Sequence, residues 1–387
     1  MTANLASAAE VVIVGGGVIG VSCAFHLAEA GVEGVLLLEQ GTFGCGSTSA
    51  AAGGVRASFS TRCNIEMGLH GLAAYAEFSK RFDQEIDFRR DGYLYLLSDE
   101  CNLSSFEAAV TLHRQHGLRT ELIGPGEAQQ RAPLIVTDGL VAALWSPDDA
   151  RVTPESVVGG YATAARRLGA VLRAGVRVID IETEGGEIVA VHTDAGTVRT
   201  GTVVCAAGAW SAEVGEMVGV SLPVVPMRRQ VLFARPATLP ASLPCITAEL
   251  PSTFYFHPEG PGLAVGFSDR TETAGFKFEY EPDDFLPALF ALAERRAPAL
   301  LDADVVGGWS GHYEVTPDDN QIIGESAKPS RFLYATGFSG HGVMMAPATG
   351  AIIRDLYLGR APQFDLGACD VRRFEDVGSR HDEQVII

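Results

Sequence analysis

Three glycines near the start of the chain have the spacing of a dinucleotide-binding turn. Gly15, Gly17 and Gly20 follow an apolar run over residues 11–14 and open a helical pattern. The first glycine of such a turn permits a tight bend, the second lets the backbone approach a pyrophosphate, and the third lets the helix pack on the strand. Glu39 ends the next apolar run, where a carboxylate can accept hydrogen bonds from ribose hydroxyls. A glycine turn in an ordinary α/β domain is the alternative.

The ribose interpretation applies to FAD and to NAD alike. A flavoprotein that also binds NAD(P)H usually carries a second glycine fingerprint, and this sequence has one. Either NAD is therefore the only cofactor, or FAD is the cofactor and a small substrate supplies the electrons.

A second glycine-rich loop lies far along the chain. Gly337, Gly340 and Gly342 surround His341 and lead into a helical pattern that contains Pro347. A loop with so few side chains lets a ligand approach the backbone closely. The side chain of His341 can donate a hydrogen bond to such a ligand or simply pack.

The scaffold for these loops is predicted to be interleaved. The chain begins as a βαβ unit whose strands are apolar on both faces, as in a parallel sheet. Residues 177–210 predict a small antiparallel meander with turns at 185–186 and 195–196. Strands dominate residues 223–319, with one helical pattern at about 284–296. We therefore expect a discontinuous chain of two domains.

Composition and charge argue against several classes of function. The formal net charge of −19 disfavours binding to nucleic acid or to anionic lipid. The seven cysteines are scattered without CxxC spacing, which indicates neither a disulfide framework nor a metal site. No apolar run is long enough to span a membrane, and no signal peptide is visible. We expect a cytoplasmic protein.

Five segments resemble, in the same order, the FAD-dependent D-amino acid oxidase, glycine oxidase and sarcosine oxidase superfamily. They are GSTSAAAGG (46–54), ARVTPESVVGG (150–160), VVCAAGAWS (203–211), YEVTPDDNQIIG (313–324) and FSGHGVMMAP (338–347). The similarity is strongest to β-subunit-type sarcosine oxidases and L-proline dehydrogenases, which share the Gly-Gly-apolar-Arg pattern of residues 53–56.

The resemblance implies an α/β (α+β) fold. A Rossmann-type FAD-binding domain of the glutathione-reductase-2 kind would be interleaved with an antiparallel-sheet substrate domain. The FAD-binding domain would comprise residues 1–84, 148–221 and 322–387. The substrate-binding domain would comprise residues 85–147 and 222–321.

The resemblance also implies which residues contact FAD. Val176 would meet the adenine ring, and the helix after His341 would face the pyrimidine end of the flavin. Ser47 would donate to phosphate oxygens, or else cap a helix, and Trp210 would either pack or contact the cofactor. The complete set is Gly15, Gly17, Val18, Ile19, Gly20, Glu39, Gln40, Gly46, Ser47, Thr48, Ser49, Gly53, Gly54, Val55, Arg56, Val176, Ala207, Gly208, Trp210, Gly337, Ser339, Gly340, His341, Gly342, Val343 and Met344.

The implied chemistry is oxidation of a C–N bond by transfer of a hydride equivalent to flavin N5. The amine must arrive neutral, which a pocket of low dielectric can achieve without a dedicated strong base. Arg56 would lie against the flavin ring rather than form a surface salt bridge. The predicted catalytic residues, with His257 as a further pocket wall, are Arg56, Tyr255, His312, Tyr313 and His341. The alternative for Tyr255, His257, His312 and Tyr313 is a satisfied polar group on a sheet face that points to solvent.

Three positions depart from familiar relatives. Tyr313 stands where glycine and D-amino acid oxidases carry an arginine for the substrate carboxylate, and Met344 stands where monomeric sarcosine oxidases carry a lysine. Ala264 stands where the latter carry an oxygen-activating lysine, which suggests dehydrogenase rather than oxidase behaviour. A carboxylate could still be held by Arg56 or Arg228.

Covalent attachment of the flavin is not expected. The attachment positions of relatives fall near Gly311, near Ala50 and at residues 152–153, and none is a cysteine or histidine. We therefore expect non-covalent FAD.

The sequence predicts an FAD-dependent oxidoreductase of a secondary or N-methyl amino acid or related amine, giving an imine. Its electrons would pass to O2 or another acceptor, and a homo- or hetero-oligomer is compatible with the sequence. The alternatives are oxidation of a 2-hydroxy acid, or a non-catalytic FAD-bound subunit or assembly factor.

Overall fold

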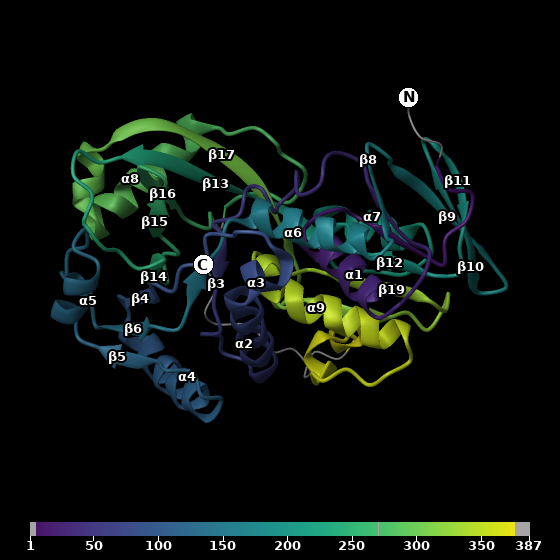
Figure 1. Ribbon diagram of the computed structural model, residues 1–387. Coiled ribbons are helices and arrows are strands. Elements are labelled where there is room, and N and C mark those ends of the chain that lie inside the picture. The colour runs from purple at the N-terminus through teal and green to yellow at the C-terminus, as the bar shows by residue number, and fades with distance from the viewer. Residues whose placement is uncertain (1–4, 270, 376–387) are drawn as a thin grey trace.

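Two large sheets lie side by side in the computed structural model, which describes residues 5–269 and 271–375. In Figure 1 the eight-stranded sheet lies on the left and the six-stranded sheet on the right. This arrangement confirms the predicted combination of a parallel, Rossmann-like sheet with a second, mainly antiparallel sheet.

The six-stranded sheet is parallel except at one edge, where β18 runs antiparallel to β19. Its strands, in spatial order, are β18 (Ile322–Glu325), β19 (Phe332–Thr336), β12 (Val203–Cys205), β1 (Val11–Val14), β2 (Val35–Glu39) and β8 (Val171–Ala174). The expected βαβ unit at the N-terminus is therefore present.

Side-chain alternation along β1 explains how this sheet is covered on both faces. Val11 and Ile13 pack in one core with α1 (Val18–Glu29), α6 (Pro154–Arg167) and α9 (Gly342–Tyr357). Val12 and Val14 pack in another core with the meander of β9 (Val178–Glu184), β10 (Glu187–Thr193) and β11 (Gly196–Arg199). Successive side chains of a strand point to opposite faces, so the apolar run VVIV can serve both layers.

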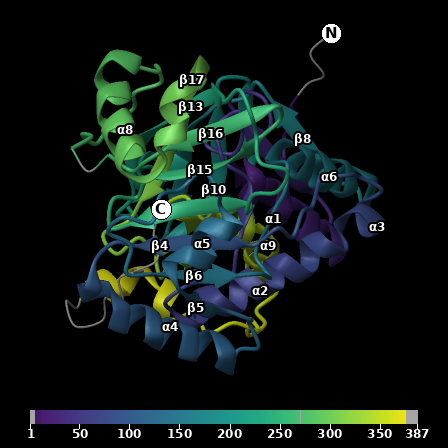
Figure 2. The same cartoon turned by 90° about the vertical axis from the view of Figure 1, so that its left-hand side faces the viewer.

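The eight-stranded sheet is antiparallel except for the parallel pair β14 and β4. Its spatial order is β17 (Asp304–Val315), β13 (Val225–Arg235), β16 (Gly262–Gly266), β15 (Tyr255–Glu259), β14 (Ile246–Leu250), β4 (Tyr93–Leu97), β6 (Ala142–Ser146) and β5 (Glu121–Ile123). Figure 2 shows α8 (Pro282–Arg296) above this sheet and α4 (Leu103–Gln115) below it. The predicted helix at about 284–296 is thus present.

The remaining elements of the described residues are a short ribbon, four helices and several 3-10 turns. A short ribbon of β3 (Gly54–Val55) and β7 (Ala150–Arg151) places Arg56 directly after a paired strand. The other helices are α2 (Arg62–Ala76), α3 (Phe78–Phe82), α5 (Pro125–Arg131) and α7 (Ser211–Glu216). Short 3-10 turns are η1 (Glu100–Asn102), η2 (Gly208–Trp210), η3 (Pro298–Asp302), η4 (Gly367–Cys369) and η5 (Val371–Phe374).

The division of the chain into five segments remains a proposal. All strands of the six-stranded sheet fall within residues 1–84, 148–221 and 322–387, and all strands of the eight-stranded sheet fall within 85–147 and 222–321.

Candidate active site

A cavity of about 1080 Å³ runs between the two sheets. At one end it is lined by the turn between β1 and α1 and by the end of β2, and at the other by β13, β15 and β17. Pockets for small ligands typically measure about 300–1,000 Å³, so this cavity can hold a ligand of dinucleotide size. It lies at the carboxyl ends of the parallel strands, where α/β sheets bind ligands.

The glycine turn makes the first end of the cavity. Gly15 has φ +109°, and a Cβ there would lie 2.3 Å from the Ala206 carbonyl oxygen, so only glycine is accommodated. Gly17 begins α1 without a side-chain cap, and the first turn of α1 carries no acidic residue. The helix dipole and the backbone N–H groups of this turn therefore favour a negatively charged ligand.

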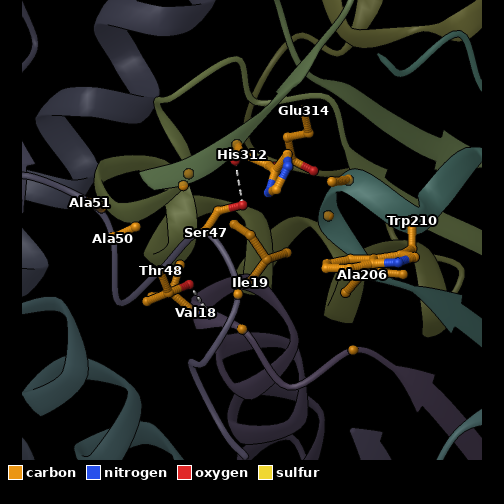
Figure 3. Close-up of a pocket in the computed structure, with 18 of the residues that line it drawn as sticks. Val18, Ile19, Ser47, Thr48, Ala50, Ala51, Ala206, Trp210, His312 and Glu314 are labelled. Atoms are coloured by element: carbon orange, nitrogen blue, oxygen red, sulfur yellow. Dashed lines mark hydrogen bonds between the residues drawn. The ribbon is translucent and has the colours of Figure 1, made fainter. Parts of the chain in front are cut away.

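The loop after β2 closes over this turn. The Val18 N–H donates to the Thr48 hydroxyl at 3.2 Å, and the Ser47 hydroxyl donates to the His312 carbonyl oxygen at 2.5 Å. Figure 3 shows both bonds as dashed lines, with Trp210 facing the same space from η2. The second bond ties the glycine-turn end of the cavity to β17 of the other sheet.

Glu39 lines the cavity as predicted, but its carboxylate is already engaged. Its Oε2 accepts from the Gly16 N–H and its Oε1 from the Gly41 N–H, both at 2.7 Å. These bonds shape the turn, so a ribose hydroxyl would share an oxygen that the backbone already holds.

A buried pair joins the two glycine-rich loops. Arg56 Nη2 lies 3.0 Å from His341 Nε2, and Arg56 Nη1 donates to the Ser58 carbonyl oxygen at 2.9 Å. A guanidinium only donates, so His341 Nε2 must accept and Nδ1 must carry the proton. That Nδ1 is buried and has no hydrogen-bond partner among the described residues. Burial, reinforced by the charge of Arg56, holds the pKa of His341 well below its usual range.

Two tyrosines and a histidine line the other end. Tyr255 comes from β15, while His312 and Tyr313 come from β17. Burial raises the pKa of both tyrosines, so each remains a neutral donor. His312 Nε2 accepts from the Lys277 N–H at 3.0 Å, and burial lowers the pKa of His312. His312 is therefore a positioned wall rather than a free base.

Two sequence-based expectations are wrong. Arg228 does not line the cavity: its Nε lies 2.8 Å from Glu272 and its Nη1 lies 2.7 Å from Glu281. His257 does not line it either, because its side chain is buried, with Nδ1 3.0 Å from the Pro258 carbonyl oxygen.

Arg229, the residue after Arg228, lines the cavity instead. Neighbouring residues of a strand point to opposite faces, so the face of β13 opposite to the paired Arg228 presents Arg229 to the cavity.

Two buried carboxyl groups were not among the residues predicted from the sequence. Glu314 lines the cavity from β17, and burial raises its pKa to about 7. Its Oε2 lies 3.1 Å from the Thr336 hydroxyl. Asp149 does not line the cavity, but it accepts from the Ala57 N–H at 2.8 Å, and burial raises its pKa to about 6. No local sequence signal marks either residue.

Most of the predicted cofactor residues line this one cavity. Five do not: Gly20, Ser49, Val55, Gly337 and Ser339. Gly20 still serves the turn, because a Cβ there would lie 1.9 Å from the Gly15 carbonyl oxygen. The others are Gly15, Gly17, Val18, Ile19, Glu39, Gln40, Gly46, Ser47, Thr48, Gly53, Gly54, Arg56, Val176, Ala207, Gly208, Trp210, Gly340, His341, Gly342, Val343 and Met344.

These features fit FAD. The bare glycine turn and the uncapped start of α1 suit its pyrophosphate. The uncapped start of α9 and the unpartnered Nδ1 of His341 suit a polar ring edge that carries negative charge on reduction.

Two features are absent from the described residues. None of their helices combines the length and the apolar character that crossing a membrane requires. None of their His, Cys, Asp and Glu side chains form a group of three or more that could hold a metal ion.

Curated proteins similar to this chain oxidise amines and amino acids, by their names. The chain is 30% identical to 4-methylaminobutanoate oxidase (formaldehyde-forming) of Paenarthrobacter nicotinovorans, over 94% of this chain and 45% of that protein. It is 29% identical to human mitochondrial dimethylglycine dehydrogenase, over 95% of this chain and 44% of that protein. The chain thus spans less than half the length of these two relatives. It is 30% identical to glycine oxidase of Geobacillus kaustophilus, over 94% of this chain and 97% of that protein.

Solved structures and a family model agree with this grouping. L-Proline dehydrogenase from P. horikoshii superposes with a TM-score of 0.89 at 29% identity, covering 96% of this chain and 99% of that one. Residues 10–356 match the family model described as "DAO: FAD dependent oxidoreductase". The chain therefore belongs to the DAO family of FAD-dependent oxidoreductases.

Proposed function

We propose that the protein oxidises the C–N bond of a secondary or N-methyl amino acid or related amine. The observation that carries this proposal is a single cavity that joins the glycine turn of α1 to the tyrosines of the eight-stranded sheet. Three similar proteins are named for a secondary or tertiary amine: 4-methylaminobutanoate oxidase, dimethylglycine dehydrogenase and L-proline dehydrogenase.

The surroundings of the cavity favour a neutral amine. Bound FAD supplies, at flavin N5, the acceptor for a hydride equivalent from the carbon next to nitrogen. Arg56 and Arg229 bring positive charge to the substrate end, and burial disfavours an ammonium there. Loss of the hydride from the amine leaves an iminium, which releases a proton or hydrolyses to an aldehyde and an amine.

We also propose that FAD is bound without a covalent bond. Gly311 lines the cavity, and a Cβ at that position would lie 2.5 Å from the Ala50 side chain, which leaves no room for a cysteine.

Weak reactivity with O2 completes the proposal. Ala264 is fully buried in β16, and none of the described residues that line the cavity is a lysine. Rapid formation of peroxide at the rate of substrate turnover would contradict dehydrogenase behaviour.

Anaerobic mixing with a substrate panel tests the proposed reaction. N-Methylglycine, N,N-dimethylglycine, 4-methylaminobutanoate and L-proline form the amine arm, and glycolate and lactate form the hydroxy-acid arm. We expect at least one amine to bleach the visible flavin band. Bleaching by hydroxy acids alone, or by no compound, would reject amine oxidation.

A further inference from the structure

We propose that Arg229 is the anchor for the substrate carboxylate, so that the preferred substrate is an N-alkyl amino acid rather than an uncharged amine. This inference rests on the proposed function and names the substrate class of the same site.

Arg229 brings a charge into the cavity without a matching anion. Its Cζ lies 5.2 Å from the centroid of the Tyr313 ring, and its Nη1 donates to the Arg228 carbonyl oxygen at 3.0 Å. Its Nε is buried and has no hydrogen-bond partner among the described residues. No carboxylate of the described residues lies within 4.0 Å of its nitrogens. A guanidinium stays charged in proteins, so a half-buried one without a carboxylate partner favours an anionic ligand.

The neighbouring cations are already compensated. Arg228 pairs with Glu272 and Glu281 on the far side of β13. Arg56 contacts the Ser58 carbonyl oxygen and His341, and its charge lowers the otherwise raised pKa of the buried Asp149. Arg177 also lines the cavity, but it is exposed and follows Val176, whose N–H donates to the Glu39 carbonyl oxygen at the glycine-turn end. Arg229 is therefore the arginine at the substrate end that remains for a ligand.

The carboxylates that line the cavity are engaged or exposed. Glu39 holds the glycine turn, and Asp194 accepts from the Arg177 N–H at 2.9 Å. Glu314 lies 3.1 Å from the Thr336 hydroxyl, and Glu213 is exposed. None of them pairs with Arg229.

Two neutral donors lie beside this cation. Arg229 Cζ lies 5.2 Å from the Tyr313 ring centroid, and Tyr255 lines the same end of the cavity from β15. No hydrogen bond of either hydroxyl to another described residue occurs. A carboxylate here would receive a guanidinium and phenolic O–H groups, the donor set that binds a planar anion most strongly.

Binding of simple carboxylates tests the anchor without turnover. The probes are acetate and butanoate, with acetamide as the neutral control, and the readouts are the visible spectrum of bound flavin and the thermal midpoint. Arg229→Met should weaken carboxylate binding roughly 10- to 100-fold, and Arg229→Lys should weaken it less. Arg235→Met, at the exposed end of the same strand, should leave it unchanged.

Substrate pairs give a second readout. For Arg229→Met we expect a raised KM for N-methylglycine and an unchanged KM for N-methylglycinamide. Unchanged binding of acetate and butanoate by Arg229→Met, with normal FAD content, would overturn the anchor.

The two proposals fail separately. If no amine bleaches the flavin but carboxylate binding depends on Arg229, the anchor stands and amine oxidation is rejected. If N-methylglycine and the other carboxylate-bearing amines are oxidised equally well by Arg229→Met, the oxidation stands and the anchor is rejected.

Discussion

Arg56 is a buried cation that contacts both an aromatic ring and polar groups. It stacks on Phe59, with its Cζ 3.9 Å from the ring centroid, and is hydrogen-bonded to the Ser58 carbonyl oxygen. Because the group pairs with His341 from the other glycine-rich loop, it links the two chain segments that line the cavity. Its charge therefore acts on whatever occupies the space between them.

Replacement of Arg56 by Met should lower the midpoint potential of the bound flavin. The reduced anionic flavin loses a nearby positive charge, so we expect a fall on the order of 30–60 mV, where 30 mV corresponds to about 1.4 kcal/mol for two electrons. Arg56→Lys keeps the charge and should retain most of the potential. Equilibrium dye titration measures both, and an unchanged potential in Arg56→Met would place Arg56 away from the flavin.

Glu314 should make the stability of the protein depend on pH. Burial raises its pKa from 4.5 to about 7, so the folded protein holds this proton more tightly than the unfolded chain. The stabilisation is fully present below pH 4.5 and is lost as pH rises through 7, by about 3 kcal/mol at most. Glu314→Gln removes the titrating group. Its thermal midpoint should therefore rise relative to that of the wild type as the pH increases from 5 to 8.

The matched control is Glu294→Gln, an exposed position on α8. Its pH profile should follow the wild type. A Glu314→Gln profile that is parallel to the wild type would show that Glu314 does not titrate in this range.

At the scale of elements, α1 and α9 both begin at bare loops that face the cavity. Their N-terminal residues carry no capping side chain, and α1 packs on both α6 and α9. The approach of α1 to β1 depends on glycine, because helix and strand backbones nearly touch at this turn.

Gly20→Ala should therefore abolish FAD binding and lower the thermal midpoint. The added methyl group would lie 1.9 Å from the Gly15 carbonyl oxygen, which must move and open the pyrophosphate turn. Gly159→Ala on α6 is the matched control, because no atom lies within 4 Å of its added Cβ. The free energy of unfolding of that variant should rise by about 0.5–1 kcal/mol, because alanine has the higher helix propensity. Full FAD content in Gly20→Ala, by absorbance ratio, would contradict this account.

At the scale of the molecule, the cavity connects two sheets that have separate cores. A ligand that contacts both should stabilise the whole chain. Removal of FAD should therefore lower the thermal midpoint. FAD added back at 100 times its Kd should raise the free energy of unfolding by about 2.7 kcal/mol.

Denaturation of the FAD-loaded protein tests whether the flavin is bound covalently. We expect all flavin to pass through a filter that retains the polypeptide. Retained flavin would reject non-covalent binding and would direct attention to Cys45, His312 and His341, the thiol and imidazoles among the described cavity residues.

Local patterns in the sequence predicted several of the elements. The glycine turn, the meander and the helix at about 284–296 each depend on residues close together in the chain, whose periodicity and φ preferences are visible without a fold. Most of the cofactor residues that the family motifs predicted line the cavity.

Contacts between distant residues needed the tertiary structure. Arg56 and His341 are 285 positions apart, and only the packing of β3 against α9 brings them within 3.0 Å. The choice between Arg228 and Arg229 depended on which face of β13 meets the cavity, and the raised pKa of Glu314 depends on burial by elements remote in sequence. Burial and charge compensation are sums over neighbours in space, so no local pattern in the chain encodes them.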